Sequence, residues 1–171
     1  YGGAVEEDVY RLANEFRNTG MPVDVFGLEP GWHSHSYSCS YKWDKTRFPN
    51  SEKMLEDLNS LNYKVNLWEH LFVHPTADIY EELLPYAGDY EVWEGLVPDF
   101  TFEEAKKIFG QHHGKAFIDK GVLGFKLDEC DNSDYNPSSW SFPNCAEFPS
   151  GMDGEQMHNM IGSLYQKVLL F

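Results

Sequence analysis

The stretch Gly124-Phe125-Lys126-Leu127-Asp128-Glu129 decides the fold that we expect for this chain. Val122, Phe125 and Leu127 are apolar, and they lead directly into two acids. A short apolar run that ends in carboxylates is typical of a buried strand whose last residues emerge at the carboxyl edge of a sheet. In a parallel α/β barrel, catalytic groups lie at that edge, which we call the rim.

Two similar runs precede this strand, and helical patterns alternate with all three. We predict parallel strands over residues 22–28, 63–69 and 122–128. Helical spacing of apolar residues predicts helices over residues 5–18, about 50–61, 77–84, 102–119 and 154–170. The predicted helix at 102 would begin with a capping box formed by Thr101 and Glu104. This alternation predicts the α/β class with right-handed crossovers, although a closed barrel needs eight strands.

Each predicted strand ends in an acid close to an aromatic residue or a turn. These ends are Glu29 with Trp32, the segment Trp68-Glu69-His70, and the pair Asp128-Glu129. Long loops follow these ends, whereas the loops at the opposite ends are short. This asymmetry predicts that the rim is the functional face. The alternative is that the acids only cap helices or pair with Lys and Arg.

The composition is that of a globular protein with many aromatic residues. Of the 171 residues, 42% are hydrophobic, 24% are charged and 16% are aromatic, and the formal net charge is −15. This negative charge argues against binding to nucleic acid or to anionic membranes, but it does not disfavour a neutral sugar. No apolar run is long enough to span a bilayer, and the three cysteines do not suggest a disulfide framework. The sequence does not indicate a cellular location.

Four segments, in order, resemble glycoside hydrolase family 31, which includes α-glucosidases and α-xylosidases. They are Pro22-Val23-Asp24-Val25 with Glu29 and Trp32; Trp43-Asp44 with Arg47-Phe48-Pro49; Lys64-Val65-Asn66-Leu67-Trp68; and Pro98-Asp99-Phe100-Thr101 with Gly121 and Gly124 to Asp128. The resemblance implies a segment of a (β/α)8 TIM barrel, from about its second strand to its fourth helix. It also implies a retaining α-glycosidase without a cofactor.

The resemblance assigns roles to particular residues. Asp128 would be the nucleophile that forms a covalent glycosyl-enzyme. Lys126 would contact the sugar and favour the ionised form of Asp128. The substrate-binding residues that it implies, besides Lys126, are Glu29, Trp32, Trp68 and Trp93.

Several departures from the family pattern bear on the substrate. Glu29 is one methylene longer than the usual Asp, and Gly31 stands where some members have an aromatic residue. In the family, the segment that corresponds to residues 69–71 often ends in Pro. We expect the residues that replace it here to add polar groups to the rim. These changes favour a galacto-configured or N-acetylated sugar over plain glucose.

The family's acid/base Asp lies on a later strand. Glu129 should not replace it, because on an extended strand its side chain would point away from that of Asp128. We therefore expect that residues 1–171 alone do not hydrolyse glycosides efficiently, and that the remainder of the same polypeptide completes the barrel.

Two other functions remain open. A barrel metallohydrolase would use His33, His35, His70 and Asp128 as ligands. A non-catalytic sugar-binding relative would use tryptophans alone, namely Trp32, Trp68, Trp93 and Trp140. We expect His112 and His113 to lie on a solvated helix face.

Overall fold

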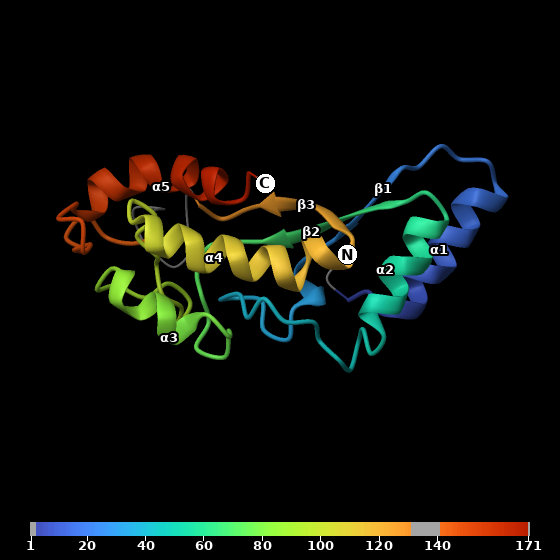
Figure 1. Ribbon diagram of the computed structural model, residues 1–171, viewed down its shortest axis with the longest axis horizontal. Helices are drawn as coiled ribbons and strands as arrows, with labels where there is room; N and C mark the ends of the chain where they lie inside the picture. Colours follow the sequence, from blue (N-terminus) through green and yellow to red (C-terminus); the bar gives the residue numbers. More distant parts are fainter. Residues whose placement is uncertain (1–2, 131–140, 171) are drawn as a thin grey trace.

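A parallel three-stranded sheet forms the centre of the computed structural model, which describes residues 3–130 and 141–170. The strands are β1 (Val25–Leu28), β2 (Lys64–Glu69) and β3 (Val122–Leu127), in the order β1-β2-β3 (Figure 1). The predicted α/β class with parallel strands is confirmed. Strand β1 begins later than predicted because the N–H of Val23 bonds to the carbonyl of Met21 in a local turn.

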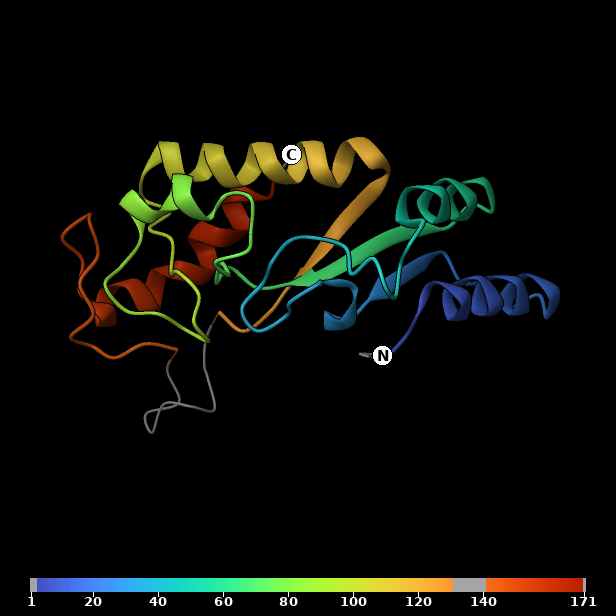
Figure 2. The same cartoon turned by 90° about the horizontal axis from the view of Figure 1, so that it is seen from below.

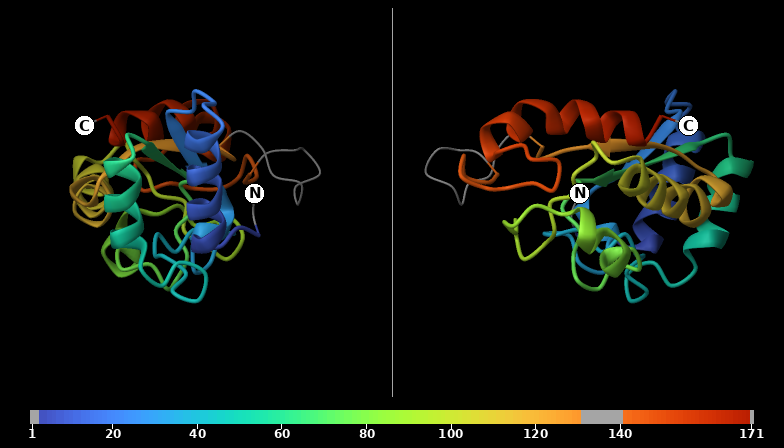
Figure 3. Two further views of the ribbon diagram at one scale, coloured as in Figure 1. Left: turned by 90° about the vertical axis from the view of Figure 1, so that its right-hand side faces the viewer. Right: turned by 60° about the vertical axis from the view of Figure 1, so that its left-hand side comes forward.

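Helices alternate with the strands, as the sequence predicts. They are α1 (Glu6–Asn18), α2 (Ser51–Ser60), α3 (Tyr80–Leu83), α4 (Glu103–Ala116) and α5 (Gly154–Val168). Helices α1 and α2 pack together at one end of the molecule, and α4 packs against α5 toward the other (Figure 2). Helix α5 runs alongside β3 in both views of Figure 3. Across the described residues, no helix has both the length and the apolar character needed to cross a bilayer.

The caps of the last two long helices differ. The predicted capping box at Thr101 and Glu104 is wrong, because α4 begins at Glu103 and the Thr101 hydroxyl donates to Asp99 Oδ1 instead. At α5, Asp153 accepts from the backbone N–H of Gln156, whose side chain bonds back to the Asp153 N–H. Reciprocal bonds of this kind satisfy donors that a helix start leaves unpaired.

The strand register divides the side chains between two faces of the sheet. Leu28 pairs with Leu67, which pairs with Phe125, and these side chains pack into the core. Gly27 pairs with Asn66, which pairs with Gly124, on the opposite face. A Cβ at Gly124 would lie 3.0 Å from the Asn66 amide nitrogen, so this position favours glycine. Since side chains alternate along a strand, one face meets the helices and the other carries the rim residues.

Candidate active site

The carboxyl ends of the strands bring together four of the predicted site residues. Trp68 pairs with Lys126, and Glu29 directly follows Leu28, so Glu29, Trp68 and Lys126 form one row across the sheet. The ammonium of Lys126 lies 3.1 Å from Glu29 Oε2 and 3.6 Å from Asp128 Oδ2. The indole N–H of Trp68 donates to Asp128 Oδ2 at 2.8 Å. Asp128, which directly follows β3, is therefore held by the side chains of Trp68 and Lys126.

The surroundings of Asp128 favour its carboxylate form. Partial burial by itself would raise the pKa of Asp128, but three donors outweigh it and hold the pKa below its usual value. The donors are the Trp68 indole, the backbone N–H of Glu129 at 3.0 Å and the Lys126 ammonium. Hydrogen bonds and an opposite charge stabilise the ionised form. The side chain keeps 42% of its surface exposed, so the carboxylate is accessible at the rim.

An aromatic wall stands beside this carboxylate, formed by Tyr37 and Trp93. Their rings meet edge to face with centroids 5.0 Å apart, and the Tyr37 ring lies 5.4 Å from that of Trp68. Trp93 is a predicted site residue, whereas Tyr37 was missed. The only signal for Tyr37 was its position in the long polar and aromatic loop after β1. Tyr37 as a residue is 43% exposed, so it is accessible to a ligand at the rim.

Glu129 also belongs to this group, contrary to the expectation from strand alternation. Strand β3 ends at Leu127, and Glu129 has a left-handed backbone with φ of 58°. Its carboxylate accepts a hydrogen bond from the Tyr37 hydroxyl at 3.3 Å. Partial burial and the nearby carboxylates of Glu129 and Asp128 raise the pKa of Tyr37 to about 12. The alternation that the prediction assumed does not apply at Glu129, because alternation holds only for extended backbone.

Two predicted tryptophans lie beneath the rim. Trp32 has no exposed surface, and its indole N–H donates to the main-chain carbonyl of Trp68 at 2.7 Å. Trp68 is 1% exposed and reaches the site through its bond to Asp128 and its contact with the Tyr37 ring. A buried ring has no face to stack on a sugar, so this placement gives both residues a supporting position.

Two further expectations are wrong. Glu69 does not add a polar group to the rim: its side chain points to the helices, where it meets His113 and Tyr165. Alternation accounts for this, because Glu69 follows the rim-facing Trp68. His113 is completely buried rather than solvated, and His112 is half-buried.

The histidines proposed as metal ligands do not converge with Asp128. His33 Nε2 bonds to the Trp68 carbonyl at 3.1 Å, and His70 Nδ1 accepts from the Phe72 N–H. His35 bonds to the Ser38 carbonyl and stacks on His74. Within residues 3–130 and 141–170, no three His, Cys, Asp or Glu side chains are grouped to hold a metal ion. The four residues named for the metallohydrolase alternative therefore do not form a common ligand set in the described part of the chain.

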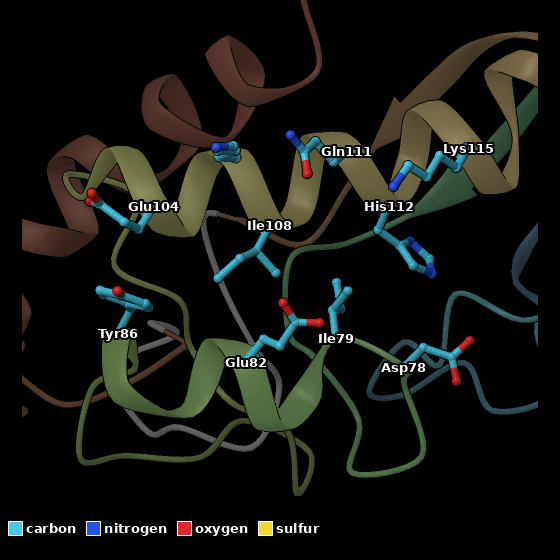
Figure 4. A pocket seen from close by; sticks show the side chains of 10 residues that line it. Asp78, Ile79, Glu82, Tyr86, Glu104, Ile108, Gln111, His112 and Lys115 are labelled. Atoms are coloured by element: carbon cyan, nitrogen blue, oxygen red, sulfur yellow. The ribbon is translucent and has the colours of Figure 1, made fainter.

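A separate groove of about 500 Å³ lies away from the rim, between α3 and α4 (Figure 4). Acids and bases both line it, among them Glu82, Glu104 and Lys115. It contains none of the predicted site residues. Trp140, which the sugar-binding alternative includes, lies outside the described residues.

Comparison with known proteins finds one family along nearly the whole chain. Residues 1–170 match the model of the "Glycosyl hydrolases family 31 TIM-barrel domain". Alpha-xylosidase XylQ of Lactiplantibacillus pentosus is 29% identical over 136 residues, which cover 72% of this chain and 18% of that protein. Alpha-glucosidase 2 of Bacillus thermoamyloliquefaciens is 27% identical over 152 residues, covering 80% and 19%. The chain thus spans about a fifth of the length of these relatives.

Solved structures show the same fold. The dextranase FjDex31A of Flavobacterium johnsoniae, complexed with glucose, aligns with a TM-score of 0.79 at 22% identity. That alignment covers 97% of this chain and 22% of the dextranase. A glucosidase II alpha subunit aligns with a TM-score of 0.80 at 17% identity, covering 98% and 20%. The predicted fold, a segment of a (β/α)8 barrel, is confirmed.

Proposed function

The chain belongs to glycosyl hydrolase family 31, and from this premise we propose that it carries the nucleophile of a retaining α-glycosidase. Asp128 attacks the anomeric carbon and displaces the leaving group, and water later releases the sugar from the covalent ester. The observation that carries this proposal is the environment of Asp128. A half-exposed carboxylate at the carboxyl end of a barrel strand accepts bonds from Trp68 and from the Glu129 N–H, beside Lys126.

The neighbouring residues take supporting and binding roles in this proposal. Trp68 orients Asp128, and Trp32 braces the main chain of Trp68. Lys126 and Glu29 bind sugar hydroxyls from the other side of the carboxylate. Trp93 and Tyr37 offer ring faces to the sugar. A binding protein without chemistry would not need an ionised, accessible acid at this point.

The proposed sugar is α-linked, and it is galacto-configured or N-acetylated rather than plain glucose. Support comes from Glu29, whose longer side chain reaches Lys126 at 3.1 Å and so occupies space that a shorter Asp would leave free. Initial rates on matched aryl α-glycosides of glucose, xylose, galactose and N-acetylgalactosamine test this. Highest kcat/KM on the glucoside or xyloside, the sugars in the names of the two relatives, would contradict it.

We also propose that residues 1–171 form about the second strand to the fourth helix of the barrel. The described sheet has three strands, whereas a closed barrel has eight. The remaining strands, and the carboxylic acid that protonates the leaving group, would then come from other parts of the same polypeptide. Retaining enzymes hold that acid about 5–5.5 Å from the nucleophile.

Trapping of the covalent intermediate tests the role of Asp128 directly. The full-length polypeptide is treated with fluorinated α-glycosyl fluorides of the four sugars, digested and mapped by mass spectrometry. The expected result is one added sugar on the peptide that contains Asp128. An adduct on any other residue would overturn the assignment.

A further inference from the structure

A buried network of three ionisable side chains lies directly behind the rim. Glu69, at the end of β2, bonds through Oε2 to His113 Nε2 of α4 at 3.0 Å. Its Oε1 accepts from the Tyr165 hydroxyl of α5 at 2.5 Å. All three residues have no exposed surface. One carboxylate therefore joins the sheet to the two helices that pack beside it.

The hydrogen bonds define where the protons lie. His113 Nδ1 is 2.9 Å from the Phe109 carbonyl, which can only accept, so Nδ1 carries a proton. One proton is then shared between His113 Nε2 and Glu69. Burial first, and the Glu69 carboxylate second, raise the pKa of Tyr165, so its hydroxyl remains a donor. Every polar atom of the three side chains thus has a partner.

This network is connected to Asp128 through two bonds. The main-chain carbonyl of Glu69 accepts from the Asp128 N–H at 2.9 Å. The preceding residue, Trp68, donates its indole N–H to the Asp128 carboxylate. Residues 68 and 69 therefore hold both the backbone and the side chain of Asp128, and the helix layer holds residue 69 in turn.

Stability alone does not explain such a network. Burying an ionic pair carries a desolvation cost, and apolar replacements of similar volume are often as stable or more so. A fully satisfied buried network does, however, fix the geometry of the residues that it joins. This distinction favours a role in orientation.

We propose that Glu69, His113 and Tyr165 are positioning residues that fix the end of β2 and thereby the orientation of the Asp128 carboxylate. The inference rests on the proposed function of Asp128. None of the three residues contacts the substrate. Their removal should slow the chemical step and leave sugar binding largely unchanged.

Two buried tyrosines, whose hydroxyl bonds lie near opposite ends of β2, provide a matched test. Tyr165→Phe removes a bond at the carboxyl end of β2. Tyr63→Phe removes an equally buried bond, from the Tyr63 hydroxyl to the Ala13 carbonyl at 2.9 Å, at the amino end. In the full-length polypeptide we expect Tyr165→Phe to lower kcat and the rate of adduct formation about 10-fold, with KM changed less than about twofold. Tyr63→Phe should lower the thermal midpoint comparably and leave kcat unchanged.

A conservative variant completes the test. In Glu69→Gln the amide can donate to His113 Nε2 and accept from Tyr165, so the network can reform and kcat should stay within about threefold of the parent. Equal kcat for Tyr165→Phe and Tyr63→Phe would overturn the positioning role, even if Tyr165→Phe is less stable. A loss in Glu69→Gln as large as that in Tyr165→Phe would also contradict it. A parent protein that is not labelled at Asp128 would instead refute the proposed function, and the network proposal with it.

Discussion

The two ends of β2 are held by different chemistry. At the amino end, Arg17 donates to the carbonyls of Leu61 and Val23, and Tyr63 donates to Ala13. These acceptors are neutral main-chain groups. At the carboxyl end, main-chain carbonyls such as that of Trp68 also accept, but the acceptors there include the ionisable side chains of Glu69 and Asp128. Hydrogen bonds to neutral groups stabilise a fold at any pH. Burial of ionisable groups lowers the free energy of unfolding, but these groups can take part in a reaction. Under the proposed function, the amino end contributes to the stability of the fold and the carboxyl end to the chemistry.

The largest effect should come from Asp128→Asn at the carboxyl end. An amide is a poor nucleophile, so kcat/KM of the full-length polypeptide should fall about 10⁴-fold or more. The thermal midpoint should stay close to that of the parent, because the side chain is half-exposed. Steady-state kinetics and thermal unfolding measure the two quantities. Asp57→Asn, on α2, is the matched control and should keep full activity. Substantial turnover by Asp128→Asn would contradict the assignment of the chemistry to the carboxyl end of β2.

Two lysines on neighbouring strands sharpen the comparison. Lys126 contacts Glu29 and Asp128 at the rim, whereas Lys64 is exposed at the amino end of β2. Lys126→Met removes a charged donor, so kcat/KM should fall about 10-fold to 100-fold. Lys64→Met should change it less than about twofold. Equal effects of the two substitutions would mean that position along the strand does not decide function.

The sequence predicts this division of the sheet better than it predicts individual contacts. Alternation of apolar residues and the order of the elements were sufficient to place Glu29 and Asp128 at one edge, whereas the role of Lys126 came from the family resemblance. Glu69 was misplaced because the pattern does not reveal which face of β2 meets the helices. The burial of His113 depends on a partner 44 positions away in the chain, which no local pattern contains. The contact between Glu129 and Tyr37 was not predicted, because an acidic residue in the sequence gives no sign that its backbone is left-handed.

A smaller effect, on the pH profile, should follow from Trp68→Phe. The indole N–H stabilises the ionised form of Asp128, so its loss raises the pKa of Asp128 relative to the parent. Because the nucleophile must be ionised, activity is lost as pH falls through this pKa, and the acid limb of kcat/KM should move to higher pH. Trp43→Phe, which replaces an indole packed on Trp32 and Phe48 with a smaller ring, should leave that limb in place. An acid limb that is identical in both variants would show that Trp68 does not tune Asp128.

The smallest effect on activity should come from Arg17→Lys at the amino end. The guanidinium donates to carbonyls of the two loops that precede β1 and β2, and it lies 3.7 Å over the Tyr63 ring. An ammonium cannot span these acceptors, so the free energy of unfolding should fall by about 1–2 kcal/mol. Denaturant unfolding measures this loss, while kcat/KM per folded molecule should equal that of the parent. A fall in kcat/KM at a temperature where Arg17→Lys is fully folded would show that strain at the amino end reaches Asp128 along the strands. The two ends would then be parts of one coupled unit, and the separation of stability from chemistry in this sheet would have to be abandoned.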